Sequence, residues 1–238
     1  MDRFGSAPPI PYPSAVRSDA ERVGAFLRAT YGWMAAGIGV TALVALVLAN
    51  SPSLVVSIIH NPFGLIGLVI AQFAVVIYLS ARVNRIAPTA AAVLFLGYSA
   101  LTGVTFSIIL LAYTRESIAA TFFVCAAMFG ALATYGTLTK RNPSALGQFM
   151  FMGLIGLVIA SLVGLFWHND MLQFLISFIG VIVFSGLTAA KAQQLTVMAL
   201  SLPEGQTGSY AVVGALSLYL SFVNLFLSLL RFTGGRRD

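Results

Sequence analysis

Long uninterrupted runs of apolar residues recur along this chain and are separated by short polar segments. The runs that contain no charged side chain are 30–50, 63–80, 86–114, 117–139, 142–167, 171–190 and 205–230. About 20 mostly apolar residues suffice for a helix to cross the hydrocarbon core of a bilayer. One such run could be a buried helix of a soluble core, but seven in succession with short connections exclude that reading. A β-barrel would show short alternating strands instead. We therefore expect an all-α membrane protein of about seven transmembrane helices.

The polar stretches outside these runs predict three regions. Residues 1–29 form an expected cytoplasmic polar tail, residues 30–232 a seven-helix transmembrane domain, and residues 233–238 a short basic tail. Pro8, Pro9, Pro11 and Pro13 predict irregular backbone at the start of the chain. No apolar segment with a cleavage site precedes the first run, so we expect that run to stay in the membrane.

Composition agrees with this pattern. Hydrophobic residues make up 59% of the chain and charged residues only 8%, whereas soluble domains carry roughly 25% charged residues. The net charge of +6 does not indicate nucleic-acid binding, because no basic stripe with interleaved aromatic residues is present. The expected partner of most of the surface is the lipid bilayer itself.

The distribution of basic residues predicts the orientation of the helices. Arginines and lysines gather in the N-terminal tail and in alternate connections, namely at Arg3, Arg17, Arg22, Arg28, Arg82, Arg85, Lys140, Arg141 and Lys191. By the positive-inside rule this side faces the cytoplasm, so we expect a cytoplasmic N-terminus. Seven spans then place Arg231, Arg236 and Arg237 outside, against the rule. Six spans plus a re-entrant segment would resolve that conflict and remain an alternative.

The chain lacks the usual constellations of catalytic chemistry. No Ser-His-Asp arrangement, paired carboxylates, phosphate loop or zinc motif is present, and the predicted spans contain no acidic residue. His60 and His168 stand in separate segments, and Cys125 is the only cysteine. We therefore expect no enzymatic activity, no cofactor and no metal site.

Polar residues nevertheless follow one face of each of the last two predicted spans. Ser217, Ser221, Asn224 and Ser228 recur at steps of four, three and four, and Ser185, Thr188, Lys191 and Gln194 at steps of three. Such faces should point toward protein or water rather than lipid, so we expect the two to meet. Their groups could be interhelical hydrogen-bond partners or a functional site, and Lys191 could instead extend to the cytoplasmic surface. Gln72, Tyr98, Tyr135 and Tyr219 are further interior candidates.

Several segments in a fixed order resemble the Bax inhibitor family of transmembrane proteins. They are Tyr98-Ser-Ala-Leu-Thr-Gly103, Tyr135-Gly-Thr-Leu-Thr-Lys-Arg-Asn142, Gln148-Phe-Met-Phe-Met-Gly-Leu-Ile-Gly156 and Leu216-Ser-Leu-Tyr-Leu-Ser-Phe-Val-Asn-Leu-Phe226. The start Met1-Asp-Arg-Phe4 and the stretch Ile70-Ala-Gln-Phe73 look like the bacterial inner-membrane branch. The resemblance covers about 31–231. It implies a bundle in which six helices surround the last one.

The resemblance also implies a pH-sensitive calcium leak, with calcium ion as a candidate partner. In that family two aspartates share a proton, and an arginine at the end of the second span shuts the path; Arg82 is the nearest match and Arg85 the alternative. This chain departs at both acidic positions. It reads Ala190-Lys-Ala-Gln193 and Leu220-Ser-Phe-Val-Asn224, so Lys191 and Ser221 stand where the family pattern has aspartate.

Two functions therefore stay open. The first is a channel-like protein whose pH-gated leak is lost or altered. The second is a non-conducting interaction protein that modulates a membrane protease or another membrane assembly, with membrane proteins as partners. A secondary transporter is a weaker third reading, because intramembrane ionisable coupling groups are missing.

Overall fold

The chain folds into a bundle of long helices. The computed structural model describes residues 13–139, 143–167, 169–202 and 207–235. Its helices are α1 (Pro13–Ala49), α2 (Pro52–His60), α3 (Pro62–Arg82), α4 (Pro88–Ala112), α5 (Arg115–Leu138), α6 (Pro143–Phe166), α7 (Asp170–Ser201) and α8 (Thr207–Thr233). Seven of them are long and apolar enough to cross a membrane. The predicted all-α membrane fold with seven spans is confirmed, and α2 is a short additional helix in the first connection.

Local sequence explains where several helices begin. Proline stands at the start of α3 and α4, where its missing N–H needs no partner. Polar side chains cap three helices: Asn61 accepts from the Gly64 amide, Thr114 from the Ser117 amide and Asn169 from the Met171 amide. These caps satisfy amides that the helices themselves leave without partners.

Two helices extend beyond the predicted runs. The first begins at Pro13, within the region predicted as an irregular tail, and α7 continues past Lys191 to Ser201. Pro8, Pro9 and Pro11 lie outside the described residues. Proline is tolerated in a first helical turn, so Pro13 does not break α1. The Arg22 guanidinium donates to the carbonyl of Leu202, 3.1 Å away, and so ties the start of α1 to the end of α7.

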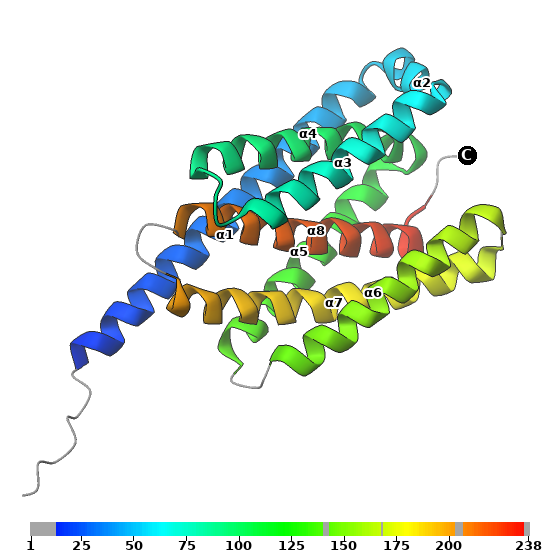
Figure 1. Ribbon diagram of the computed structural model, residues 1–238. Coiled ribbons are helices and arrows are strands. Elements are labelled where there is room, and N and C mark those ends of the chain that lie inside the picture. Colours follow the sequence, from blue (N-terminus) through cyan, green and yellow to red (C-terminus); the bar gives the residue numbers. More distant parts are fainter. Residues whose placement is uncertain (1–12, 140–142, 168, 203–206, 236–238) are drawn as a thin grey trace, which may run out of the picture.

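The last helix occupies the centre of the bundle (Figure 1). It packs against α1, α4, α5 and α7 and touches α3, whereas α6 packs on α7. In its most apolar stretch 67% of the residues are buried, against 6% in α3 and in α6. The interior is therefore built around α8, and α3 and α6 lie at the periphery.

The core around α8 is centred on Tyr219, whose side chain is fully buried. The rings of Phe95 and Tyr98 in α4 meet it edge-on, with centroids 5.6 and 5.8 Å away, a favourable arrangement for aromatic pairs. The Thr41 hydroxyl in α1 lies 2.6 Å from the Tyr219 hydroxyl. Residues of two of the family-like segments thus form the contact between α1, α4 and α8.

Glycine permits one especially close helix contact. A side chain at Gly136 in α5 would collide with the backbone carbonyl of Ala189 in α7. Only a residue without a Cβ atom lets these two backbones approach so closely. This contact holds α5 against the half of α7 that carries Lys191.

Candidate functional site

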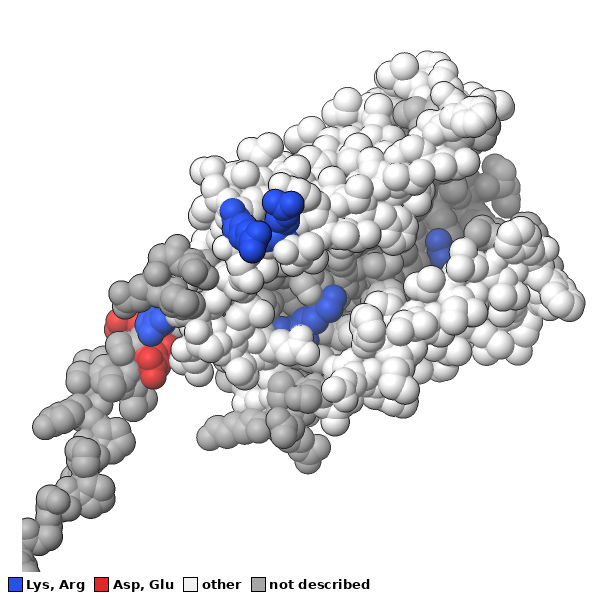
Figure 2. All heavy atoms as spheres, viewed as in Figure 1, with Lys and Arg blue, Asp and Glu red and all other residues white. Residues whose placement is uncertain are grey.

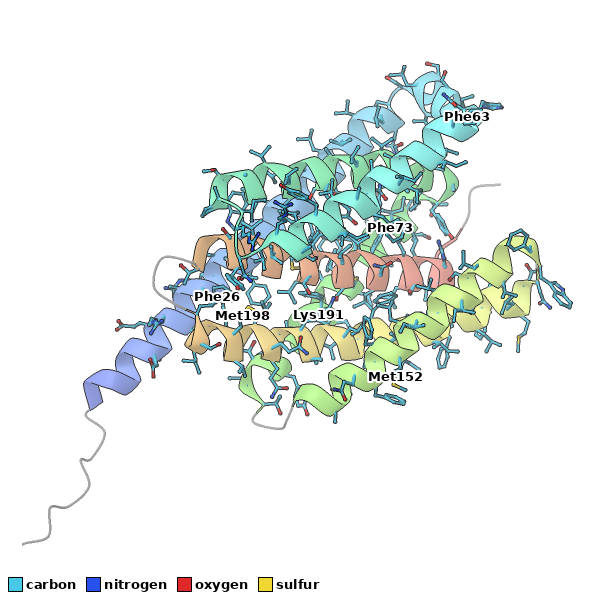
Figure 3. All side chains as sticks on the ribbon, in the orientation of Figure 1. Phe26, Phe63, Phe73, Met152, Lys191 and Met198 are labelled. Atoms are coloured by element: carbon cyan, nitrogen blue, oxygen red, sulfur yellow. The ribbon has the colours of Figure 1, made fainter. Side chains whose placement is uncertain are left out.

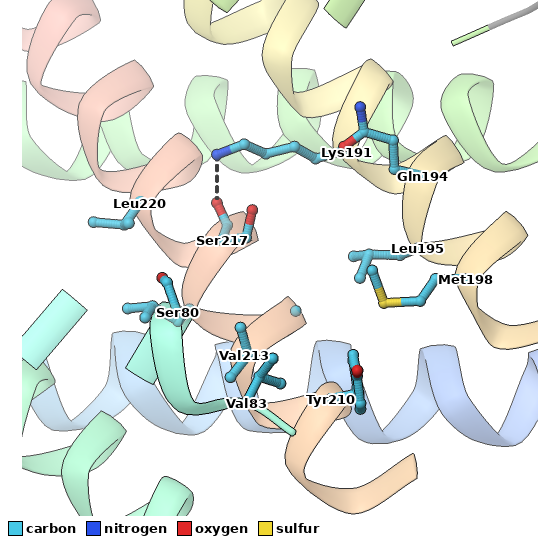
Figure 4. A pocket seen from close by; sticks show the side chains of 12 residues that line it. Ser80, Val83, Lys191, Gln194, Leu195, Met198, Tyr210, Val213, Ser217 and Leu220 are labelled. Carbon is cyan, nitrogen blue, oxygen red and sulfur yellow. Dashed lines mark hydrogen bonds between the residues drawn. The ribbon is translucent and has the colours of Figure 1, made fainter. Parts of the chain in front are cut away.

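A polar cavity lies between α3, α7 and α8. Its volume is 360 Å³. The polar residues that line it are Ser80 from α3, Lys191 and Gln194 from α7, and Tyr210 and Ser217 from α8. Figure 4 shows the Lys191 side chain reaching from α7 toward α8 across this space. A space-filling view shows basic atoms inside the hollow that separates α3 from α6 and α7 (Figure 2).

Lys191 and Ser221 meet at one atom. The Lys191 Nζ donates a hydrogen bond to the backbone carbonyl of Ser217 over 3.1 Å. The Ser221 hydroxyl donates to the same carbonyl over 3.2 Å. Ser217 lies one helical turn before Ser221 in α8, so that its carbonyl oxygen faces the serine and the lysine together. Ser221 is only 1% exposed, and Lys191 is half-buried.

The electrostatic character of this cavity is positive. Lys191 is its one charged lining residue among those described. The carboxylates of Glu116 and Asp170 lie in the first turns of α5 and α7, at the opposite end of the bundle, and Asp19 and Glu21 lie near the start of α1. None of these four residues lines the cavity. A lysine inside a span costs on the order of 3 kcal/mol on insertion scales, and the hydrogen bond to a carbonyl oxygen offsets part of that cost.

The polar faces of α7 and α8 meet, but several of their polar side chains bond within their own helix. Ser185 and Thr188 donate to the carbonyls of Val181 and Phe184, one turn earlier in α7. The Asn224 amide likewise donates to the carbonyl of Leu220 in its own helix. Among the hydrogen bonds of Ser185, Thr188, Lys191 and Asn224, only the one from Lys191 to the Ser217 carbonyl joins the two faces. For Ser185, Thr188, Ser221 and Asn224, the interpretation as interhelical partners is wrong, because each side chain donates to a carbonyl one turn earlier in its own helix.

The remaining sequence-predicted residues lie apart from the Lys191 cavity. The Gln72 amide donates to the Thr105 hydroxyl over 3.1 Å and joins α3 to α4. Arg82 is exposed at the end of α3, and its guanidinium carbon lies 5.8 Å from the centre of the Tyr78 ring. Arg82 does not line the cavity, although Ser80 and Val83 on either side of it do.

Three tyrosines have different environments. Tyr98 and Tyr219 lie in the core, as predicted from the sequence. Tyr135 was also predicted to be an interior residue, but it is 56% exposed and does not belong to the interior. Tyr210 was not among the candidates, yet it lines the cavity and its hydroxyl donates to the Asn84 side chain after α3. Both Tyr210 and Asn84 lie near the ends of apolar runs, where periodicity gives no signal.

Other chemistry-bearing residues form no cluster. Cys125 is fully buried, with its sulfur 3.8 Å from the carbonyl of Phe222. His60 is exposed at the end of α2, and His168, Lys140 and Arg141 lie outside the described residues. Within the described part of the chain, no three His, Cys, Asp or Glu side chains are grouped so that they could hold a metal ion.

Seven apolar helices, one of which is the buried central helix α8, define a multi-pass helical membrane protein. A family model described as Inhibitor of apoptosis-promoting Bax1 matches residues 23–238. The inner membrane protein YbhL of Escherichia coli (strain K12) is 45% identical over 240 aligned positions, which cover 100% of each chain. The chain belongs to the Bax inhibitor family.

Relatives occur in distant bacteria. An uncharacterized protein of Deinococcus radiodurans is 41% identical over 219 residues, covering 92% of this chain and 93% of the relative. An uncharacterized membrane protein of Streptococcus pyogenes serotype M1 is 38% identical over 212 residues, covering 88% and 92%. The similarity therefore extends over nearly the whole bundle rather than over one motif.

Proposed function

We propose that this chain is a non-enzymatic inner-membrane member of the Bax inhibitor family that lacks the pH-gated calcium leak implied by the family resemblance. The observation that carries the proposal is the Lys191 ammonium on the carbonyl of Ser217, shared with the Ser221 hydroxyl. A positive and a neutral side chain stand together where the family pattern has two carboxylates. The presence of Lys191 and Ser221 in place of the two carboxylates would abolish the calcium leak.

The physical argument concerns both gating and binding. Two adjacent carboxylates share a proton because like charges raise one pKa, and this makes the pair sensitive to pH. An ammonium beside a hydroxyl has no such shared proton. Calcium is bound in proteins by about six to eight oxygen ligands, including carboxylates. Here the Ser217 carbonyl oxygen already accepts a hydrogen bond from a tethered cation, which also repels a divalent ion.

The test is calcium flux into liposomes that contain the purified full chain and a trapped calcium indicator. We expect the unaltered protein to show no flux that changes with a pH step across neutrality. Replacing both positions, Lys191→Asp with Ser221→Asp, should create a pH-dependent flux. The matched control is Lys191→Met with Ser221→Ala, which removes the ammonium without adding carboxylates and should give no pH dependence.

Each result separates the open functions. Flux through the unaltered protein with a midpoint near neutral pH would overturn the proposal, because another group would then be the sensor. If the double aspartate variant folds and stays silent, the scaffold itself does not conduct. That result would favour the second function, a non-conducting protein that acts through membrane-protein partners.

A further inference from the structure

A second and larger cavity lies on another side of α8. Its volume is 510 Å³, and it is bounded by the C-terminal halves of α1 and α4, the N-terminal half of α5 and the middle of α8. Its walls are apolar, with the aromatic rings of Phe106 and Phe122 among them. None of its lining residues belongs to the Lys191 cavity. It is therefore a separate site.

Polar groups occupy only the two ends of this cavity. At its inner end the Thr41 and Tyr219 hydroxyls lie 2.6 Å apart, and Thr41 also bonds to the carbonyls of Gly37 and Ser99. These groups satisfy one another. At its outer end lie Asn50, just after α1, and Arg115, the first residue of α5. From Thr41 to the end of α1 at Ala49 the axial rise is about 12 Å, which is the length of the apolar section.

Arg115 differs from the inner hydroxyls because its guanidinium has no acidic partner among the described residues. It makes no ion pair there, and Glu116, the next residue, does not line the cavity. A guanidinium binds phosphate oxygens in a bidentate manner. The positive end of the α5 dipole lies at the same place and also favours an anion. The cavity thus pairs a long apolar section with a cation at its mouth that makes no ion pair within the part of the chain that the structure describes.

We propose that this cavity binds one acyl chain of an anionic phospholipid, with the phosphate of the head group at Arg115. Ligand cavities of about 300 to 1,000 Å³ are mostly apolar with a few placed polar groups, and this one fits that description. Exposed Leu46 and Phe123 belong to the lining and leave the cavity open at the bundle surface. A lipid can therefore enter sideways from the bilayer. A zwitterionic lipid would fill the same walls but would bring no net charge to Arg115.

The test is native mass spectrometry of the full chain in detergent with phosphatidylglycerol or phosphatidylcholine of matched acyl chains. We expect phosphatidylglycerol to bind about fivefold more tightly, the effect of one basic residue near a membrane surface. Arg115→Gln should abolish this preference. Ala119→Trp, which places a large side chain into the cavity, should weaken the binding of both lipids.

The matched control is Arg231→Gln, another exposed arginine, at the end of α8, that does not line the cavity. It should leave the preference unchanged. Equal binding of the two lipids would overturn the proposal, as would a preference that survives Arg115→Gln. If Ala119→Trp leaves the binding of both lipids unchanged, the lipid binds to the general surface of the bundle and not in this cavity, which would also overturn the proposal. Thermal unfolding of each variant verifies that lost binding does not reflect a misfolded chain.

Discussion

The side chain of Lys191 shows how a charged group is accommodated inside this bundle (Figure 3). The helix that carries it has 32 residues, and Lys191 lies about 15 Å before its end at Ser201. Its ammonium reaches a carbonyl of the neighbouring helix rather than a carboxylate. A single hydrogen bond of this kind contributes only about 1 to 3 kcal/mol, which is no more than the insertion cost of the charge.

This balance predicts the effect of removing the charge. Lys191→Met keeps most of the side-chain volume, and the Ser217 carbonyl retains the Ser221 hydroxyl as a partner. We expect the thermal unfolding temperature, followed by tryptophan fluorescence, to stay equal or rise. Lys191→Glu instead sets a carboxylate against that carbonyl oxygen and should lower stability by about 1 to 3 kcal/mol. A large loss of stability in Lys191→Met would show that the ammonium holds α7 and α8 together.

Sequence alone indicated which residues share a face but not which atoms they contact. Of the residues that spacing placed on one face, Ser221 is buried, whereas Ser217 and Asn224 are half-buried. Spacing cannot show that a hydroxyl is satisfied by its own helix, since a carbonyl one turn earlier is always within reach. It also cannot show that Lys191 and Ser221 converge on the same carbonyl, because that depends on the relative position of two helices.

At the scale of helices, hydrophobic runs predicted the number of spans but not all of their ends. Charged residues ended the predicted runs at Thr30 and Ala190, whereas α1 and α7 continue through such residues. Charged side chains do not break a helix, because Arg, Lys and Glu are good helix formers. The proline at the start of α4 and the Thr114 cap of α5, in contrast, mark boundaries that the sequence already contains.

The contact between α5 and α7 gives a prediction at this scale. Gly136→Ala adds a methyl group where the Ala189 carbonyl lies, so the two helices must separate. We expect a loss of about 1 to 3 kcal/mol, the usual cost of overpacking, measured as a lower unfolding temperature. Gly130→Ala in the same helix is the matched control, since no atom lies within 4 Å of the added carbon. Equal behaviour of the two variants would contradict the close contact.

In the whole molecule, the two cavities lie toward different ends of the bundle. Ser80 and Tyr210, near the end of α3 and the start of α8, line the Lys191 cavity, whereas Asn50 and Arg115 line the larger one. The start of α1 and the end of α8 lie at opposite ends of the bundle (Figure 1). If all seven candidate spans cross the membrane, the number of crossings is odd. The helix α8 is continuous over 27 residues, which is long enough for one crossing. Which end faces the cytoplasm depends on charge, and the arginines before Thr30 predict that the start of α1 does.

Single-cysteine labelling tests this orientation in spheroplasts with a membrane-impermeant maleimide. Ala20→Cys in α1 should react only after lysis, whereas Ser53→Cys in α2 and Thr233→Cys at the end of α8 should react from outside. All three positions are exposed, and the natural Cys125 is buried, so the unaltered chain serves as the unlabelled control. Labelling of Ala20→Cys in intact spheroplasts would reverse the orientation. Protection of Thr233→Cys together with Ala20→Cys would mean an even number of crossings. In the expected orientation the Lys191 cavity lies toward the cytoplasm and Arg115 lies at the outer leaflet. The phospholipid proposed to bind at Arg115 would then come from the outer leaflet.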